Sequence, residues 1–125
     1  MQDLRPRFLN LTQIKFPITA IVSIAQRVSG VFLFIALPVI LCYLQQSLTS
    51  QTSFNEVVAS IGNNIWLQLG IWLYALALVF HTLGGIRHLI MDIGFLEELC
   101  IAKLTSYLTF ALTLVLMLIA YLWIY

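Results

Sequence analysis

Three long apolar runs dominate the chain and are separated by short polar stretches. They extend from about Ile18 to Leu44, from Ile65 to Ile90 and from Leu104 to Ile124. A helix needs roughly 20 apolar residues to cross a bilayer, and its backbone then satisfies its own hydrogen bonds. The alternating short segments of a membrane β-barrel do not occur. The pattern predicts an all-α integral membrane protein with three transmembrane helices, forming a single domain over residues 1–125.

The connection between the first two runs, residues 45–64, has a shorter helical pattern of its own. Ser53 and Glu56 have the spacing of a capping box, and Gly62 follows as a stop signal. We expect a short amphipathic helix on the membrane surface that presents four apolar side chains to the lipid, namely Phe54, Val57, Val58 and Ile61.

All basic residues fall on one side of the predicted membrane domain. They flank the start of the first span or the second connection: Arg5, Arg7, Lys15, Arg27, Arg87 and Lys103. Aromatic residues typical of membrane interfaces gather towards the opposite ends: Trp66, Trp72, Tyr121, Trp123 and Tyr125. Because cytoplasmic loops carry the excess of Lys and Arg, we expect the N-terminus in the cytoplasm.

Composition agrees with a membrane protein, since 62% of the residues are hydrophobic and only 9% are charged. A net charge of +1 argues neither for nor against nucleic acid, but the sequence has no basic stripe and no RNA-binding aromatic motif, so no nucleic-acid partner is expected. The N-terminus lacks the apolar region of a secretory signal. Cys42 and Cys100 have no metal-ligand spacing and are expected to be packing residues. A multi-pass protein of the bacterial inner (cytoplasmic) membrane is the simplest interpretation, and a mature organellar protein is the alternative.

Polar side chains inside the spans are functional candidates, because a central charge costs about 2.5–3.5 kcal/mol on insertion scales. Ser23 and Arg27 stand four residues apart, on one face of the first helix. A hydroxyl and a guanidinium together suit a ligand with carbonyl or carboxylate oxygens. Gly30, one turn further, allows another body to approach closely. The alternative is that Arg27 only anchors the helix end by reaching the interface.

The second span contains both histidines of the chain. His81 and His88 are seven residues apart, roughly 10 Å along one face. Gly84 and Gly85 lie between them and leave bare backbone, against which a flat ligand could press. Close packing of helices on small residues is the alternative explanation of the glycines. His81 is accordingly either an axial ligand of haem or the donor of an interhelical hydrogen bond.

The geometry of haem restricts how these residues could be used. Two axial ligands approach iron from opposite sides, so His81 and His88 on one helix face cannot both bind it. The ring belongs deep in the membrane and the propionates near the aqueous edge, which favours His81 as the iron ligand, with His88 and Arg27 near the propionates. Met117 could in principle supply the second ligand, but a His from a partner subunit is more economical. A six-coordinate haem at His81 would therefore imply a membrane domain made of more than one kind of subunit.

Two motifs also carry a family resemblance. Arg5-Pro6 followed by FPITAIVSIAQRVSG (residues 16–30), and HTLGGIRHLIMD (residues 81–92), resemble the two signatures of the cytochrome b556 subunit of succinate dehydrogenase. The chain departs from that family at one position, because the family commonly has His where Gln26 stands. Gln cannot titrate, although it can still donate a hydrogen bond to a carboxylate.

The resemblance implies an anchor for a larger respiratory enzyme. This chain and a second small three-span subunit would anchor a flavoprotein and an iron–sulfur subunit, and succinate would be oxidised in the flavoprotein, so no catalytic residue is expected here. Electrons would pass through the iron–sulfur subunit to ubiquinone. Ser23 and Arg27 would line the quinone site, and His81 would ligate haem b opposite a His of the other anchor subunit. A fumarate reductase anchor and a haem-free structural anchor remain as alternatives.

Overall fold

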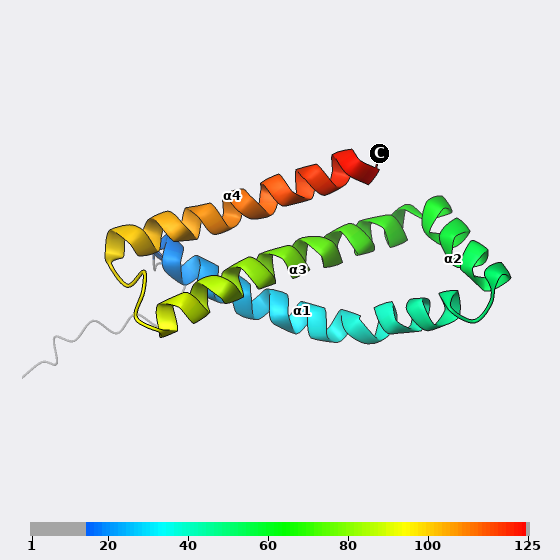
Figure 1. The fold of residues 1–125 in the computed structure, drawn as a ribbon, viewed down its shortest axis with the longest axis horizontal. Coiled ribbons are helices and arrows are strands. Elements are labelled where there is room, and N and C mark those ends of the chain that lie inside the picture. The colour runs from blue at the N-terminus through cyan, green and yellow to red at the C-terminus, as the bar shows by residue number, and fades with distance from the viewer. Residues whose placement is uncertain (1–14, 125) are drawn as a thin grey trace, which may run out of the picture.

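The computed structural model describes residues 15–124, and within them it is entirely helical. In chain order the helices are α1 (Ile18–Ser47), α2 (Gln51–Asn63), α3 (Ile65–Asp92) and α4 (Leu99–Ile124). Helices α1, α3 and α4 are each long and apolar enough to cross a membrane, which confirms the three predicted spans. They run alongside one another, and α2 joins α1 to α3 at one end (Figure 1). The predictions for Arg5, Arg7 and Tyr125 lie outside the described residues.

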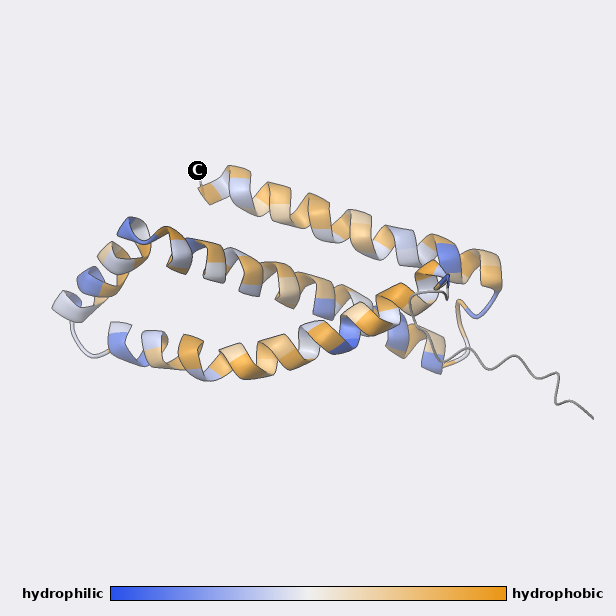
Figure 2. Cartoon of the chain, turned by 180° about the vertical axis from the view of Figure 1, so that it is seen from behind, coloured by the Kyte–Doolittle hydropathy of each residue, from blue (hydrophilic) through white to orange (hydrophobic). Residues whose placement is uncertain are grey.

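The surface of the three long helices is apolar over most of its area. Figure 2 shows hydrophobic residues along α1, α3 and α4, with hydrophilic residues more frequent near the helix ends. Large side chains such as Phe34, Val28 and Leu114 expose more than half of their surface, at 78%, 62% and 67%. Lipid can solvate such side chains but water cannot do so favourably. The exposed surface therefore fits a bilayer environment.

Helix α3 packs between α1 and α4, and α4 contributes an aromatic side chain and buried hydroxyls to the interior of the bundle. Phe80 of α3 and Phe110 of α4 stack with ring centroids 5.3 Å apart. Three hydroxyls on α4 are buried, and each donates to a carbonyl of the preceding turn: Ser106, Thr109 and Thr113. Small, internally satisfied hydroxyls let membrane helices approach closely.

Helix α4 begins at Leu99, five residues before the predicted start at Leu104. The backbone N–H of Ala102 donates to the carbonyl of Glu98 at 2.8 Å, in the first turn of α4. The residues from Leu99 to Ala102 are apolar, and the helix continues through the single charge of the exposed Lys103, whose long side chain can reach the membrane interface. The connection is correspondingly short, and Gly94 supplies a left-handed conformation there with φ 86°.

The predicted surface helix exists as α2, but it begins with a different cap from the one expected. Its N-cap is Ser50, whose hydroxyl accepts from the N–H of Ser53 at 3.1 Å, so the predicted cap at Ser53 is wrong. Its apolar residues also border a half-open apolar hollow of about 510 Å³ beside α1 and α3: Phe54, Val57, Val58 and Ile61. Phe54 and Val58 remain 48% and 51% exposed, and their contact with lipid stays a prediction. Figure 1 shows α1 and α3 diverging towards α2, which leaves room for these side chains.

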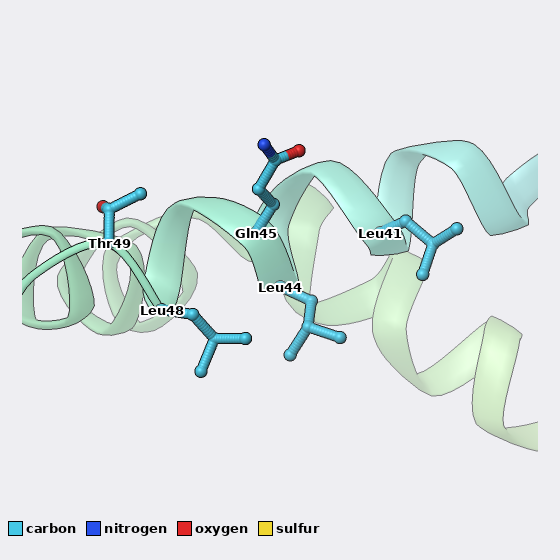
Figure 3. A pocket seen from close by; sticks show the side chains of 5 residues that line it. All are labelled: Leu41, Leu44, Gln45, Leu48 and Thr49. Atoms are coloured by element: carbon cyan, nitrogen blue, oxygen red, sulfur yellow. The ribbon is translucent and has the colours of Figure 1, made fainter.

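A second hollow lies on the outer surface at the C-terminal end of α1. Figure 3 shows three leucines pointing to one side and two polar side chains above them: Leu41, Leu44, Leu48, Gln45 and Thr49. The hollow has a volume of about 530 Å³ and is open to the surroundings. Leu41 is roughly 18 Å along the helix from Ser29, so this hollow is separate from the polar cluster described below.

The described basic residues gather at one end of the helical bundle. Lys15 precedes α1 and Arg27 lies in its first third, Arg87 lies in the last turns of α3 and Lys103 in the first turns of α4. These three helix ends lie together in Figure 1, opposite α2. The structure thus keeps the one-sided charge distribution read from the sequence, and the cytoplasmic location of this end stays a prediction.

Candidate functional site

The His81 ring lies against α1, where two oxygen atoms meet one of its nitrogens. Nδ1 is 3.1 Å from the carbonyl oxygen of Gln26 and 3.1 Å from Oγ of Ser29. A carbonyl oxygen carries no proton, so Nδ1 is the donor in this contact, and the contact selects the Nδ1–H tautomer. Nε2 then holds the lone pair. Among the described residues, Nε2 of His81 has no hydrogen-bond partner. This nitrogen is not fully buried, so a ligand could reach it.

Gly30 allows the His81 ring to approach α1 so closely. A Cβ atom built on Gly30 would lie 2.9 Å from Cε1 and 3.4 Å from Nδ1 of His81. Real Cβ atoms do not approach that closely, so any larger residue would displace the ring. The sequence predicted that Gly30 allows another group to pack closely against α1, and in the structure that group is the ring of His81.

The Gln26 side chain occupies the bare backbone between the two histidines. Its Nε2 donates to the carbonyl of His81 at 2.9 Å. A Cβ on Gly84 would collide with Oε1 of Gln26, and one on Gly85 would lie 3.3 Å from its Nε2. In this structure the side chain of Gln26 fills the space over these glycines, so they let α1 and α3 pack closely. The expected flat ligand against the bare backbone stays a prediction.

Gln26 also leaves one polar atom unsatisfied. Its Oε1 is the single buried side-chain oxygen or nitrogen without a partner among residues 15–124. The orientation of the amide is determined by the bond from Nε2 to the carbonyl of His81, so Oε1 remains an acceptor. A donor from outside the described chain would satisfy this oxygen.

The donor set at His81 suits a cofactor that brings most of its own ligands. No group of three or more His, Cys, Asp and Glu side chains comes together in the described part of the chain, so a bare metal ion would find few ligands. Haem supplies four equatorial nitrogens and needs only axial ligands from protein. A half-buried imidazole with a free Nε2 lone pair fits that requirement.

The other predicted site residues do not join His81 through hydrogen bonds. Ser23 is half-buried and Arg27 is exposed, and neither side chain has a hydrogen-bond partner among the described residues. Successive residues of a helix are about 100° apart, so Arg27 leaves α1 on a different side from its neighbour Gln26. His88 is half-buried, two turns from His81 on α3. The polar groups of Ser23 and Arg27 are thus available to a ligand or a partner chain.

Two residues that matter in the structure received no role from the sequence. Ser29 contacts His81, and its position three residues after Gln26 on the same side of α1 is the signal that could have identified it. Arg87 is 5% exposed and donates from Nε to Oγ1 of Thr105 and from Nη2 to the carbonyl of Ala102, both at 3.0 Å. The sequence marks Arg87 as a charge near the end of the second span, and in the structure its side chain ties α3 to α4.

Comparison with known proteins agrees with this architecture. Residues 1–120 match the family described as Succinate dehydrogenase/Fumarate reductase transmembrane subunit. The chain is also 35% identical over 125 residues to the succinate dehydrogenase cytochrome b556 subunit of Coxiella burnetii (strain RSA 493 / Nine Mile phase I), covering 100% of both chains. The matched region contains both sequence motifs and all three membrane spans. The chain therefore belongs to the family of transmembrane subunits of succinate dehydrogenase and fumarate reductase.

Proposed function

We propose that this chain binds haem b through Nε2 of His81, as one half of the membrane anchor of a succinate:ubiquinone oxidoreductase. The observation that carries the proposal is the 3.1 Å contact between Nδ1 and the carbonyl oxygen of Gln26. It requires the proton on Nδ1 and leaves a lone pair on Nε2. A metal-bound His usually donates its other ring N–H in this way. When bound, haem supplies one-electron redox chemistry.

The proposed site needs a second subunit. An iron ligand opposite His81 cannot come from His88, which lies on the same helix. A His from a second small three-span anchor subunit would complete the coordination. An iron–sulfur subunit and a flavoprotein would bind at the basic end of the bundle, and succinate would be oxidised in the flavoprotein. The family description, a transmembrane subunit of these enzymes, supports such partners.

Arg27 and His88 are the proposed partners of the haem propionates. Both lie nearer than His81 to a helix end at the basic side of the bundle, where carboxylates could also reach water. A guanidinium can bind a carboxylate with two parallel hydrogen bonds, so Arg27 would contribute the stronger of the two contacts.

Ser23 and Arg27 are the proposed contacts of ubiquinone. Their donors have no partner among the described residues, and a donor in a membrane span is costly unless something accepts from it. Reduction takes two electrons and two protons and raises the negative charge on the quinone oxygens. A hydroxyl and a fixed positive charge at those oxygens would stabilise that charge. A fumarate reductase anchor would use the same groups in the reverse direction.

A reduced-minus-oxidised optical spectrum of the purified membrane complex tests haem binding. We expect a b-type haem signal in the wild type that is lost or altered in His81→Ala. Thr82→Ala is the matched control, because Thr82 is exposed and its hydroxyl donates only to the carbonyl of Leu78 in its own helix. The control should retain the wild-type spectrum.

The outcomes separate haem binding from a structural role. An intact wild-type complex without a haem signal would overturn the cytochrome assignment and leave a haem-free anchor. A haem signal unchanged in His81→Ala would place the ligand elsewhere. Co-purification of the other subunits is measured in each variant, so that loss of haem is distinguished from loss of the complex.

A further inference from the structure

We propose that Ser29 is a positioning residue that lowers the reduction potential of the haem held by His81. The inference rests on the proposed function, and it concerns a residue of α1 to which that function assigns no part. Ser29 would act through the imidazole ring and would touch neither iron nor quinone.

The hydrogen bonds around Ser29 determine the direction in which it acts. Its Oγ donates to the carbonyl of Gln26 at 2.9 Å, so the hydroxyl proton is already used. The lone pairs of Oγ then face Nδ1 of His81 at 3.1 Å and can accept the ring proton. Nδ1–H is thereby shared between two oxygens, the carbonyl of Gln26 and the hydroxyl of Ser29.

This arrangement affects the electron density that His81 offers through Nε2. An acceptor at Nδ1–H draws the proton away from the ring and makes the other nitrogen more basic. A more basic axial ligand stabilises ferric over ferrous iron and lowers the potential. Ser29 is only 9% exposed, so water has little access to replace a missing hydroxyl. Loss of the Ser29 hydroxyl should therefore change the reduction potential of the haem.

The experiment is a spectroelectrochemical titration of the haem in the intact complex. We expect Ser29→Ala to raise the midpoint potential, Ser29→Cys to raise it less, and Ser29→Thr, which keeps a hydroxyl, to stay close to the wild type. Ser106→Ala is the matched control. Ser106 is also a buried serine that donates to its own helix, at 2.7 Å to the carbonyl of Ala102, but no hydrogen bond joins it to His81. The midpoint potential of the haem in the Ser106→Ala complex should equal that of the wild-type complex.

Each other result overturns the inference. An unchanged or lower potential in Ser29→Ala contradicts the proposed role, and an equal rise in Ser106→Ala reduces it to a general packing effect. If Ser29→Ala does not assemble, the Cys and Thr variants must still differ from each other in the stated order. Absence of haem from the wild-type complex is a separate failure, because it removes the proposed function itself.

Discussion

Neighbouring residues on α1 serve different surroundings because the helix turns about 100° at each step. The Gln26 side chain enters the interface with α3 and donates to the carbonyl of His81. Arg27 is exposed, with no hydrogen-bond partner in the described chain. Ser23, one turn earlier, is half-buried and equally without a partner. One helix can therefore hold the histidine ring and still offer separate polar groups to a ligand.

We predict that Arg27→Leu lowers quinone reduction by the complex more severely than Ser23→Ala does. A hydrogen bond to a charged group contributes about 1.5–3 kcal/mol and a neutral one about 1 kcal/mol, so we expect losses of roughly 10–100-fold and roughly fivefold respectively. Succinate oxidation with an artificial acceptor reports on assembly and should persist in both variants. Lys103→Leu, at another exposed cation of the same end, is the control. Near-normal quinone reduction in assembled Arg27→Leu would refute the proposed contact.

At this scale the sequence identified the chemistry of single residues better than their contacts. The cost of polar groups in lipid singled out His81, and the spacing of Ser23 and Arg27 placed them on one face. The partners of His81 depend on how α1 and α3 face each other, which periodicity within either helix does not specify. The roles of Gln26 and Ser29 were missed for that reason, and Arg87 was missed because its partners lie on α4.

Helix α3 uses one side for α1 and another for α4. His81 and Gly84 meet α1, whereas Arg87 and Phe80 meet α4 through hydrogen bonds and a ring contact. Gly84 is required on the side that faces α1, because the space between the two helices holds the carboxamide of Gln26 and has no room for an additional methyl group. Helix α3 therefore fixes the spacing of both its neighbours.

The α1–α3 contact yields a prediction about a pair of residues. Gly84→Ala should destabilise the complex by about 1–3 kcal/mol through overpacking against Gln26, seen as a lower midpoint of thermal inactivation. Removing the opposing carboxamide in Gln26→Ala/Gly84→Ala should return part of this loss, so the two changes are non-additive. Gly70→Ala is the control, since a Cβ there meets nothing within 4 Å. Additive losses in the double variant would mean that the two side chains do not meet.

The sequence predicted the helices correctly where lipid determines the hydropathy pattern, that is, in the three spans. It was less accurate for the start of α4 and for the surroundings of α2. Twenty apolar residues predict a span whatever the partners, and all three spans were found. The first turn of α4, from Leu99 to Ala102, is apolar as well, but Lys103 separates it from the longer run, so the start was predicted five residues too late. The apolar face of α2 was assigned to lipid, yet an amphipathic pattern does not distinguish lipid from neighbouring helices.

On the scale of the whole molecule, charge and polarity separate the two ends. The exposed cations and both histidine-bearing turns lie towards one end, and α2, in a connection without Lys or Arg, lies at the other. If the basic end faces the cytoplasm, the proposed quinone and haem groups lie on the side where the soluble subunits would dock. A short electron path from those subunits into the membrane would follow.

Membrane sidedness can be measured with single cysteines in a chain freed of Cys42 and Cys100. Thr49→Cys, in the exposed connection between α1 and α2, should react with an impermeant maleimide only from the periplasmic side. Glu97→Cys, in the exposed connection before α4, should react only from the cytoplasmic side. Reversed labelling would contradict the orientation predicted from the basic residues while leaving the helical fold intact.

The hydrogen bonds to His81 have a consequence for maturation of the complex. All three groups that position the ring belong to α1 of the same chain: the Gln26 carbonyl, Ser29 and Gly30. If Nε2 of His81 binds the haem iron as proposed, this nitrogen is oriented as soon as α1 and α3 have packed together in the membrane, before a second subunit or a cofactor arrives. Insertion of the proposed haem would then require little further ordering of the His81 ring. The ring would keep its orientation in the chain without cofactor until the partner subunit binds.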